Sequence, residues 1–153
     1  MRRKDREITD RKEILDIVNS AKVMRIAFFD EEYPYVLPFN FGYEKKDGRL
    51  YFYIHTATEG RKNTLIDRNN KVAFELDICH DYVQGSITSR YESVVGNGTM
   101  TEITDTEEKL SALSLILKQY GEITYKADSS CAARTRVYRL SVNEISGKAN
   151  RGK

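Results

Sequence analysis

The chain has 153 residues, of which 40% are hydrophobic and 31% are charged. Its 25 Lys and Arg residues nearly balance its 23 Asp and Glu residues, and a net charge of +2 is too small to indicate a nucleic-acid-binding protein. The length predicts one domain over residues 1–153. We interpret the short basic segments at about residues 1–7 and 148–153 as solubilising tails.

The sequence also carries no signal for a membrane or an oxidising compartment. No window approaches the roughly 18 apolar residues of a membrane span, and no apolar run follows the basic start as it would in a secretory signal. Cys79 and Cys131 lie far apart without CxxC spacing, so neither a disulfide framework nor a zinc site is indicated. We therefore expect a protein of the reducing cytoplasm with no membrane partner.

The first predicted elements are a helix and a strand with an unusual proline. Asp10 and Glu13 have the spacing of a capping box, and the apolar residues behind them predict a helix over residues 10–20. A strand over residues 35–43 contains Pro38, which has no N–H for a ladder and so indicates an edge, a bulge or a neighbouring group other than a strand. The other predicted strands cover residues 23–29, 50–55, 71–77, 91–103 and 135–145, and the other predicted helices cover residues 61–68 and 105–120. Asp105 begins the last of these helices, with Glu108 three residues on as in the first.

Turn signals connect these elements into an antiparallel barrel. An Asp-Gly pair at residues 47–48 predicts a hairpin, and Gly96 and Gly98 predict a bend in the longest strand. Residues 79–90 are expected to be a loop or the irregular entry to a strand, and residues 125–133 a loop. The pattern predicts a mainly β (α+β) fold, with six antiparallel strands in a small barrel and helices packed outside it.

The corner after the third strand has the composition of an anion site. Gly60 is followed by Arg61 and Lys62 at the start of a predicted helix, and Thr56 and Thr58 precede them. Helix N–H groups, an Arg fork and a Lys point charge together suit a phosphate. The alternative is an exposed turn with two solvated cations, and the spacing alone does not separate the two.

Histidine gives the only side-chain candidate for direct chemistry. His55 ends an aromatic strand, where it could bind a substrate, ligate a metal or transfer a proton, although a satisfied polar residue at a strand end is the plainer interpretation. His80 stands beside Cys79, and neighbouring residues on a strand point apart, so no metal site is proposed there. No nucleophile motif such as Gly-x-Ser-x-Gly occurs, so an enzyme of this sequence would depend on a cofactor.

Several segments, taken in order, resemble the FMN-binding split barrel of the pyridoxamine 5′-phosphate oxidase superfamily, and most closely its nitroimidazole-resistance branch. The similar segments cover residues 1–8, 33–43, 50–62, 72–77, 91–98 and 145–148. The resemblance implies a split β-barrel with flanking helices and a homodimer with FMN in the groove between its subunits. The cofactor-binding residues that it implies are Val36, Leu37, Pro38, Phe39, Asn40, His55, Thr56, Ala57, Gly60, Arg61, Lys62, Tyr91, Glu92 and Ser93.

In this resemblance Arg61 and Lys62 hold the FMN phosphate, and Gly60 allows the backbone to come close. Residues 36–40 would run beside the isoalloxazine, residues 55–57 would continue the pocket wall, and residues 91–93 would line it from the partner chain. The sequence has no counterpart of the basic C-terminal segment that binds substrate in the vitamin-salvage oxidases, which argues against pyridoxamine 5′-phosphate as substrate.

The resemblance implies an oxidoreductase that takes electrons from a nicotinamide or another donor and reduces a small electrophile such as a nitroaromatic. His55 is then the candidate catalytic residue. Two other functions are compatible with the same barrel. One is a non-catalytic flavin or haem binder, with His55 or His80 as a haem ligand. The other is a nucleic-acid-binding barrel, which the nearly neutral charge disfavours.

Overall fold

One antiparallel sheet, seen in a computed structural model that describes residues 3–122 and 124–151, carries the fold. Its strand order is β3-β2-β6-β7-β8-β5-β4, and β1 pairs with the far end of β8. The strands are β1 (Glu7–Ile8), β2 (Met24–Phe28), β3 (Tyr35–Phe39), β4 (Gly42–Lys46), β5 (Arg49–Ala57), β6 (Lys71–Tyr82), β7 (Ser89–Ile103) and β8 (Thr135–Asn150). The helices are the 3-10 helix η1 (Lys4–Arg6), α1 (Arg11–Ser20), α2 (Arg61–Arg68), α3 (Thr106–Gln119) and α4 (Ser129–Ala133).

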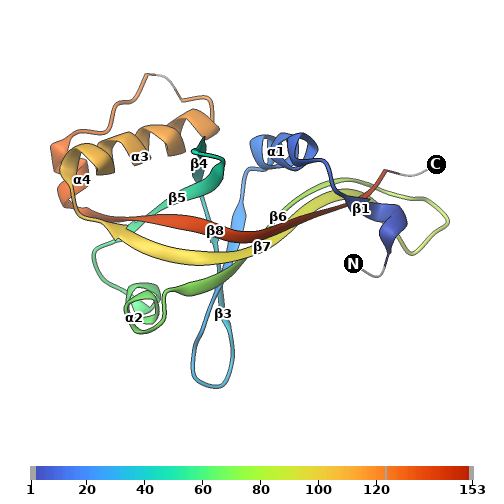
Figure 1. Cartoon of the computed structure of the whole chain (residues 1–153), viewed down its shortest axis with the longest axis horizontal. Coiled ribbons are helices and arrows are strands. Elements are labelled where there is room, and N and C mark those ends of the chain that lie inside the picture. Colours follow the sequence, from blue (N-terminus) through green and yellow to red (C-terminus); the bar gives the residue numbers. More distant parts are fainter. Residues whose placement is uncertain (1–2, 123, 152–153) are drawn as a thin grey trace.

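The sheet curls into a split barrel because its longest strands bend, and helices flank it (Figure 1). In β7 and β8 the register shifts so that Asn97 faces Glu144 while Gly98 faces Val142, which leaves Asn143 as an extra residue in a bulge. A Cβ at Gly98 would lie 2.3 Å from the Ser141 carbonyl oxygen, so only glycine permits this close approach. The bend predicted from the glycines is therefore confirmed.

Two hydrophobic clusters lie on opposite faces of the sheet. The larger fills the barrel and includes Phe52, Phe74 and Leu140 together with the buried face of α1. The smaller lies beneath α3, where Ile116 packs with Val137 of β8. Because neighbouring residues of a strand point to opposite faces, β8 contributes to both clusters. Figure 1 shows α3 lying over β4 and β5 at one end of the sheet, and α1 near the middle.

The strand count differs from the prediction because the predicted strand over residues 35–43 is two strands. The chain leaves the ladder after Phe39, so that β3 pairs with β2 at one edge of the sheet while β4 pairs with β5 at the other. With the short β1, residues 3–122 and 124–151 contribute eight strands to the sheet instead of the predicted six. Pro38 lies on the edge strand β3, so the edge position, one of the three explanations predicted for this proline, is confirmed.

Three further boundaries are corrected. Residues 79–90 are not all loop, because β6 continues to Tyr82 and β7 begins at Ser89. The segment 125–133 contains the short helix α4, which Asp128 caps by accepting a hydrogen bond from the Cys131 N–H at 2.9 Å. Residues 146–150 extend β8 beyond its predicted end. Here β8 gains partners on both sides, which the local pattern of apolar residues does not reveal.

The basic segments at the two ends of the chain are in part elements of the fold. Residues 4–6 form η1, and β1 places Glu7 opposite Lys148 and Ile8 opposite Gly147. Ile8 is buried, so an apolar anchor among the charges holds this segment. Residues 1, 2, 152 and 153, the outermost parts of the predicted tails, lie outside the described residues.

The helix starts follow the predicted capping residues. The Asp10 carboxylate accepts from the Lys12 N–H at 2.8 Å, and the Asp105 carboxylate accepts from the Glu108 N–H at 2.8 Å. Such caps satisfy N–H groups that the first helical turn leaves without an intrahelical partner. Within the described residues, no helix is long and apolar enough to span a membrane.

Candidate functional site

The corner between β5 and α2 keeps the N-terminus of α2 free of a side-chain cap. Gly60 stands at the cap position with φ 131° and ψ 160°, a conformation that side-chain-bearing residues rarely adopt. Within the part of the chain that the structure describes, an aspartate side chain caps each of the other three α-helices, whereas no side chain caps α2. The positive end of the α2 dipole and its first N–H groups are thus available to an anion.

Both predicted cations lie at this corner. The Lys62 ammonium is 3.7 Å from where a Cβ of residue 60 would stand, so it folds back over the glycine. The Arg61 guanidinium lies 5.0 Å from the centre of the Tyr35 ring and donates a hydrogen bond to Asp30. A planar fork, a point charge and backbone donors meet beside a residue without a side chain. This donor set fits a phosphate group.

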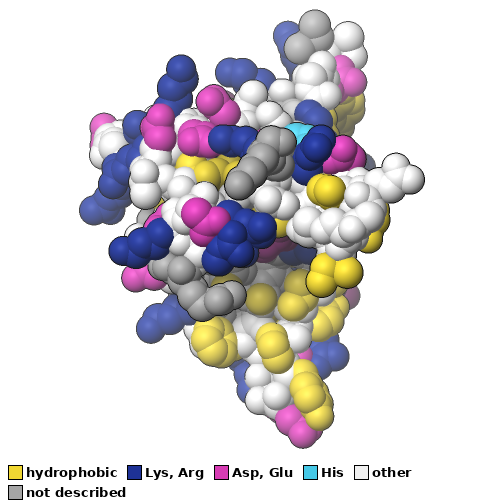
Figure 2. Space-filling view, turned by 90° about the vertical axis from the view of Figure 1, so that its right-hand side faces the viewer, with side chains coloured by type: hydrophobic (Ala, Val, Ile, Leu, Met, Phe, Trp, Pro, Cys, Tyr) yellow, Lys and Arg dark blue, Asp and Glu magenta, His cyan; other side chains and the backbone are white. Residues whose placement is uncertain are grey.

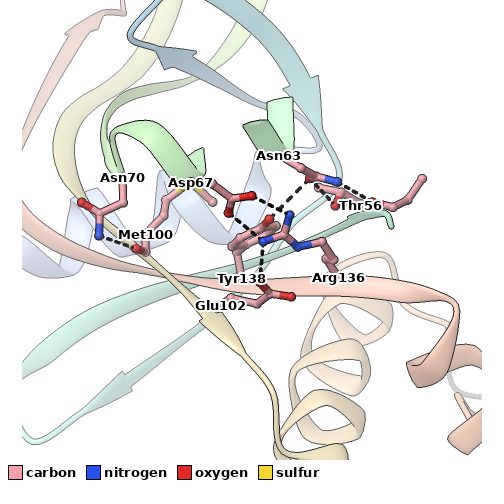
Figure 3. Close-up of polar contacts among 9 residues, drawn as sticks. Thr56, Asn63, Asp67, Asn70, Met100, Glu102, Arg136 and Tyr138 are labelled. Carbon is pink, nitrogen blue, oxygen red and sulfur yellow. Dashed lines mark hydrogen bonds and ion pairs between the residues drawn. The ribbon is translucent and has the colours of Figure 1, made fainter. Parts of the chain in front are cut away.

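A buried hydrogen-bond network holds the corner in place (Figure 3). Asn63, only 3% exposed, donates from Nδ2 to the Ala57 carbonyl at 2.8 Å. Its Oδ1 accepts from the Thr56 hydroxyl at 2.9 Å and from the Tyr138 hydroxyl at 3.4 Å. Since its own N–H donates to the Gly60 carbonyl at 3.0 Å, Asn63 ties the first turn of α2 to both β5 and β8.

The other end of α2 is also fixed. Arg136 of β8 forms hydrogen bonds with Asp67 of α2, the shorter at 2.7 Å, and another with Glu102 of β7. The hydrogen bond to Asp67, followed by that to Glu102, raises the pKa of Arg136 above its ordinary value. Just beyond α2, Asn70 donates from Nδ2 to the Met100 carbonyl at 3.0 Å (Figure 3). The helix that presents Arg61 is therefore anchored at both ends.

His55 and Thr56 do not share one wall. Thr56 is 3% exposed, faces the barrel interior and bonds Asn63, whereas His55 lies on the opposite face and is exposed. Partial burial lowers the pKa of His55, which favours a neutral ring at pH 7. Ala57 is exposed at the end of β5. The described residues contain no group of three or more His, Cys, Asp or Glu side chains that could hold a metal ion.

The predicted residues of β3 divide between two faces. Val36 and Pro38 are exposed on the outer face, and Leu37 and Phe39 point toward the barrel core. Asn40, which follows β3, is exposed. Since β3 pairs only with β2 among the described strands, one side of its backbone is not used by the sheet.

The outer face of the sheet carries a groove that the sequence analysis did not identify. It has a volume of about 770 Å³ and crosses β3, β2, β6, β7 and β8. Ala27 and Ala73 face each other across β2 and β6, while Val36 and Val95 are 53% and 47% exposed. The small side chains leave room between larger ones. In the sequence of β2, Arg25 and Ala27 alternate with the larger apolar residues Met24, Ile26 and Phe28, and this alternation was the signal that could have revealed this face.

Residues 91–93 lie far from the corner within one chain. Thr99 pairs with Lys71 just after α2, and Tyr91 is eight residues back along β7, which corresponds to about 26 Å. Hydrogen bonds to Lys148 and Arg6 outweigh the effect of burial and lower the pKa of Tyr91. The corner between β5 and α2 and the end of β7 that carries residues 91–93 lie at opposite ends of the sheet (Figure 1).

The far end of the sheet forms a second, polar pocket of about 520 Å³. Glu92 lines it and accepts a hydrogen bond from Arg151 Nε at 2.7 Å, and its carboxylate lies 3.2 Å from His80 Nε2. Burial acts to raise the pKa of Glu92, but Arg151 and His80 outweigh it and lower this pKa. Ser93 donates its hydroxyl to the Lys148 carbonyl at 3.4 Å.

A family model described as pyridoxamine 5′-phosphate oxidase matches residues 10–149. This range contains the corner, the groove and residues 91–93. A search of curated proteins found no match.

Solved structures share the fold. A candidate 5-nitroimidazole antibiotic resistance protein from Bacteroides thetaiotaomicron is 31% identical, with a TM-score of 0.83 over 94% of this chain and 86% of that chain. An FAD and haem binding protein from Mycobacterium smegmatis is 18% identical, with a TM-score of 0.78 over 96% of this chain and 74% of that chain. An FAD binding protein from the same organism is 23% identical, with a TM-score of 0.66 over 96% and 99% of the two chains.

Replacing Asn63 with Ala should destabilise the protein, because Thr56 and the Ala57 carbonyl would lose a buried partner. We expect the free energy of unfolding to fall by about 2–3 kcal/mol. Urea denaturation followed by circular dichroism measures this change. Asn19→Ala is the control, because the Asn19 side chain is exposed and its bond from the Tyr43 hydroxyl is exposed too, and a change below about 0.5 kcal/mol is expected there. Equal losses in the two variants would contradict the role given to Asn63.

Proposed function

This chain belongs to the pyridoxamine 5′-phosphate oxidase family, and on that premise we propose that it binds FMN and acts as an FMN-dependent oxidoreductase. The single observation that carries the proposal is the corner at the start of α2. There Gly60, Arg61 and Lys62 meet a helix N-terminus that no side chain caps.

The donor set at this corner suits a phosphate monoester. Arg61 offers a planar fork of N–H donors and Lys62 a compact positive charge, so both the shape and the charge of a phosphate are matched. Gly60 has no side chain to keep a ligand away from the backbone. The anchoring of α2 by Asn63 supports the proposal, because a site held in place before binding loses less entropy when the ligand arrives.

The neighbouring edge strand supports a place for the ring system. Pro38 has no N–H, and β3 pairs on one side only among the described strands, so a polar ring edge could meet backbone groups there without breaking a ladder. Next to β3, the groove with Ala27 and Ala73 gives an apolar surface with room for a planar group.

Bound FMN would supply two-electron transfer between a nicotinamide or another donor and a small electrophile such as a nitroaromatic. The chain would bind the phosphate and shield the ring from water. His55 would contribute as a neutral imidazole near the end of β5. Because His55 points to the other face of β5 from the buried Thr56, it is a weaker candidate for contact with the flavin than the corner residues.

Titration with FMN tests the binding site directly. We expect the fluorescence of FMN to be quenched when it binds to the protein. The double variant Arg61→Ala, Lys62→Ala should raise the Kd of FMN about 100-fold, since two charge-assisted phosphate contacts are lost. The control is Lys45→Ala combined with Lys46→Ala, which removes two exposed cations from β4 and should leave Kd unchanged. Loss of affinity in both double variants, or in neither, would refute the assignment of the corner.

Turnover is a separate measurement. The FMN-loaded protein should oxidise a nicotinamide donor when a nitroaromatic acceptor is present, followed as the loss of absorbance of the reduced nicotinamide. His55→Gln should lower kcat less than about tenfold if His55 only lines the pocket, and by the 10²–10⁴-fold typical of acid–base catalysis if it transfers a proton. Tight FMN binding without any turnover would instead favour a non-catalytic flavin binder.

We also propose that the protein is a homodimer and that the groove on the outer face lies in its interface. Tyr91 lies about 26 Å along β7 from Thr99, which pairs with Lys71 just after α2, so we infer that residues 91–93 line the flavin site from a second copy. Exposed Val36 and Val95 lie in the groove. Figure 2 shows hydrophobic side chains gathered over the lower part of the face that it presents. An exposed apolar surface of this kind is typical of an interface.

Replacing both Val36 and Val95 with Asp should give a monomer, because four carboxylates would have to be desolvated across a two-fold interface. Size-exclusion chromatography with light scattering measures the mass. Tyr125→Asp is the control, since Tyr125 is 56% exposed but lies on the segment between α3 and α4, away from the groove. A monomeric wild-type protein, or a variant that remains dimeric, would contradict this interface.

A further inference from the structure

Asp30 places a carboxylate at the corner that binds the phosphate in our proposed function. It lies on the hairpin that joins β2 to β3, and its Oδ1 accepts a hydrogen bond from the Glu31 N–H at 2.9 Å. Its Oδ2 accepts from Nη2 of Arg61. The Asp30 side chain is only 9% exposed, while that of Arg61 is 64% exposed. The carboxylate is thus covered by its partners, and Arg61 remains accessible from outside.

The Asp30 carboxylate is an anion at neutral pH. The hydrogen bond from the Glu31 N–H, aided by Arg61, holds the pKa of this carboxyl below its usual range despite the opposing effect of desolvation. Each of these bonds stabilises the charged form. Arg61 is therefore paired with a fixed negative charge that belongs to the chain itself.

We propose that Asp30 sets the affinity and the ligand preference of the corner, because its carboxylate competes with a ligand's phosphate for Arg61. The inference rests on the proposed function, since it takes Arg61 as a phosphate-binding residue. Asp30 is a specificity-determining residue and has no part in electron transfer.

The geometry around Arg61 explains why the two anions compete. The guanidinium is held between Asp30 and the ring of Tyr35, which come from the two arms of one hairpin. A phosphate that uses the remaining N–H donors of Arg61 comes to lie beside the Asp30 carboxylate, and the two negative charges repel each other. A phosphate that takes Arg61 away from Asp30 leaves a covered carboxylate without its cation. Either arrangement weakens binding relative to a neutral side chain at position 30.

The repulsion depends on the charge of the ligand. It acts on a phosphate dianion such as that of FMN, and it leaves riboflavin, which has no phosphate, unaffected. Asp30 therefore narrows the difference in affinity between FMN and riboflavin. A corner with a neutral residue at position 30 would favour the phosphorylated form more strongly.

The test compares the Kd of FMN and of riboflavin for the wild-type protein and for Asp30→Asn. Asn keeps the size of the side chain and an oxygen that can accept from the Glu31 N–H, and melting temperatures confirm that each variant is folded. We expect Asp30→Asn to lower the Kd of FMN about five- to tenfold, because it removes a unit charge beside the phosphate, and to leave the Kd of riboflavin unchanged.

Glu31→Gln is the matched control. Glu31 is on the same hairpin, its side chain is 80% exposed, and it lies 3.7 Å from Arg68 instead of Arg61. The Glu31→Gln substitution removes one negative charge, as Asp30→Asn does, but it does not free Arg61, so the Kd of FMN should change less than twofold. An equal gain in both variants would show a general effect of charge and overturn the role of Asp30.

The remaining outcomes separate this inference from the proposed function. If the wild-type protein binds FMN and Asp30→Asn leaves the preference for FMN, the Kd of riboflavin divided by the Kd of FMN, unchanged or lowers it, Asp30 is no competitor and the inference alone fails. If neither protein binds either flavin, the proposed function fails and the inference fails with it. If only Asp30→Asn binds FMN, competition by Asp30 is supported in its strongest form.

Discussion

The placement of the candidate site depends on one buried amide, that of Asn63. A buried amide is stable only if its donors and acceptor find partners, and Asn63 finds them on β5, on β8 and in the first turn of its own helix. These bonds fix the chain between Ala57 and Gly60, so the glycine is held in its unusual conformation. The direction in which Arg61 and Lys62 leave the backbone follows from the same constraint.

The same sheet provides both a covered and an open face, and β8 shows why. Val137 packs beneath α3 while Tyr138 points into the barrel, so the sheet is covered on both sides near α3. The bulge at Asn143 then bends the strand, and none of the described helices lies over the remaining outer face of β2, β6 and β7 (Figure 1). The apolar groove is a direct consequence of where the helices pack, since Val36 and Val95 would otherwise be covered.

Much of the fold could be predicted from local signals. The caps at Asp10 and Asp105 and the Asp-Gly turn at residues 47–48 act through neighbouring residues, and all three appear as expected. The family and the split barrel also followed from the order of the segments. The division of residues 35–43 into β3 and β4 could not be predicted, because it depends on which distant strand each half pairs with.

The candidate site shows the same division between local and distant causes. Gly60, Arg61 and Lys62 adjoin in sequence and lie together at the α2 corner. Asp30 and Asn63 were missed, since the partner of Arg61 is thirty-one residues away and Asn63 acts through a strand seventy-five residues away. Neighbours in sequence can also be separated, as with His55 and Thr56, because the pleat of a strand sends them to opposite faces.

The anchor and the reacting surface of the proposed site have different physical origins. The phosphate corner is built within one chain from α2 and its buried supports, and it needs no second copy to form. The groove beside β3 is open on its outer side, and in the proposed dimer the partner closes it. A change at the interface can therefore alter what reaches the ring while the cofactor stays anchored. In the proposed dimer, the acceptor would be selected where the second copy adds its side chains, so the same barrel could keep its flavin site and serve different acceptors.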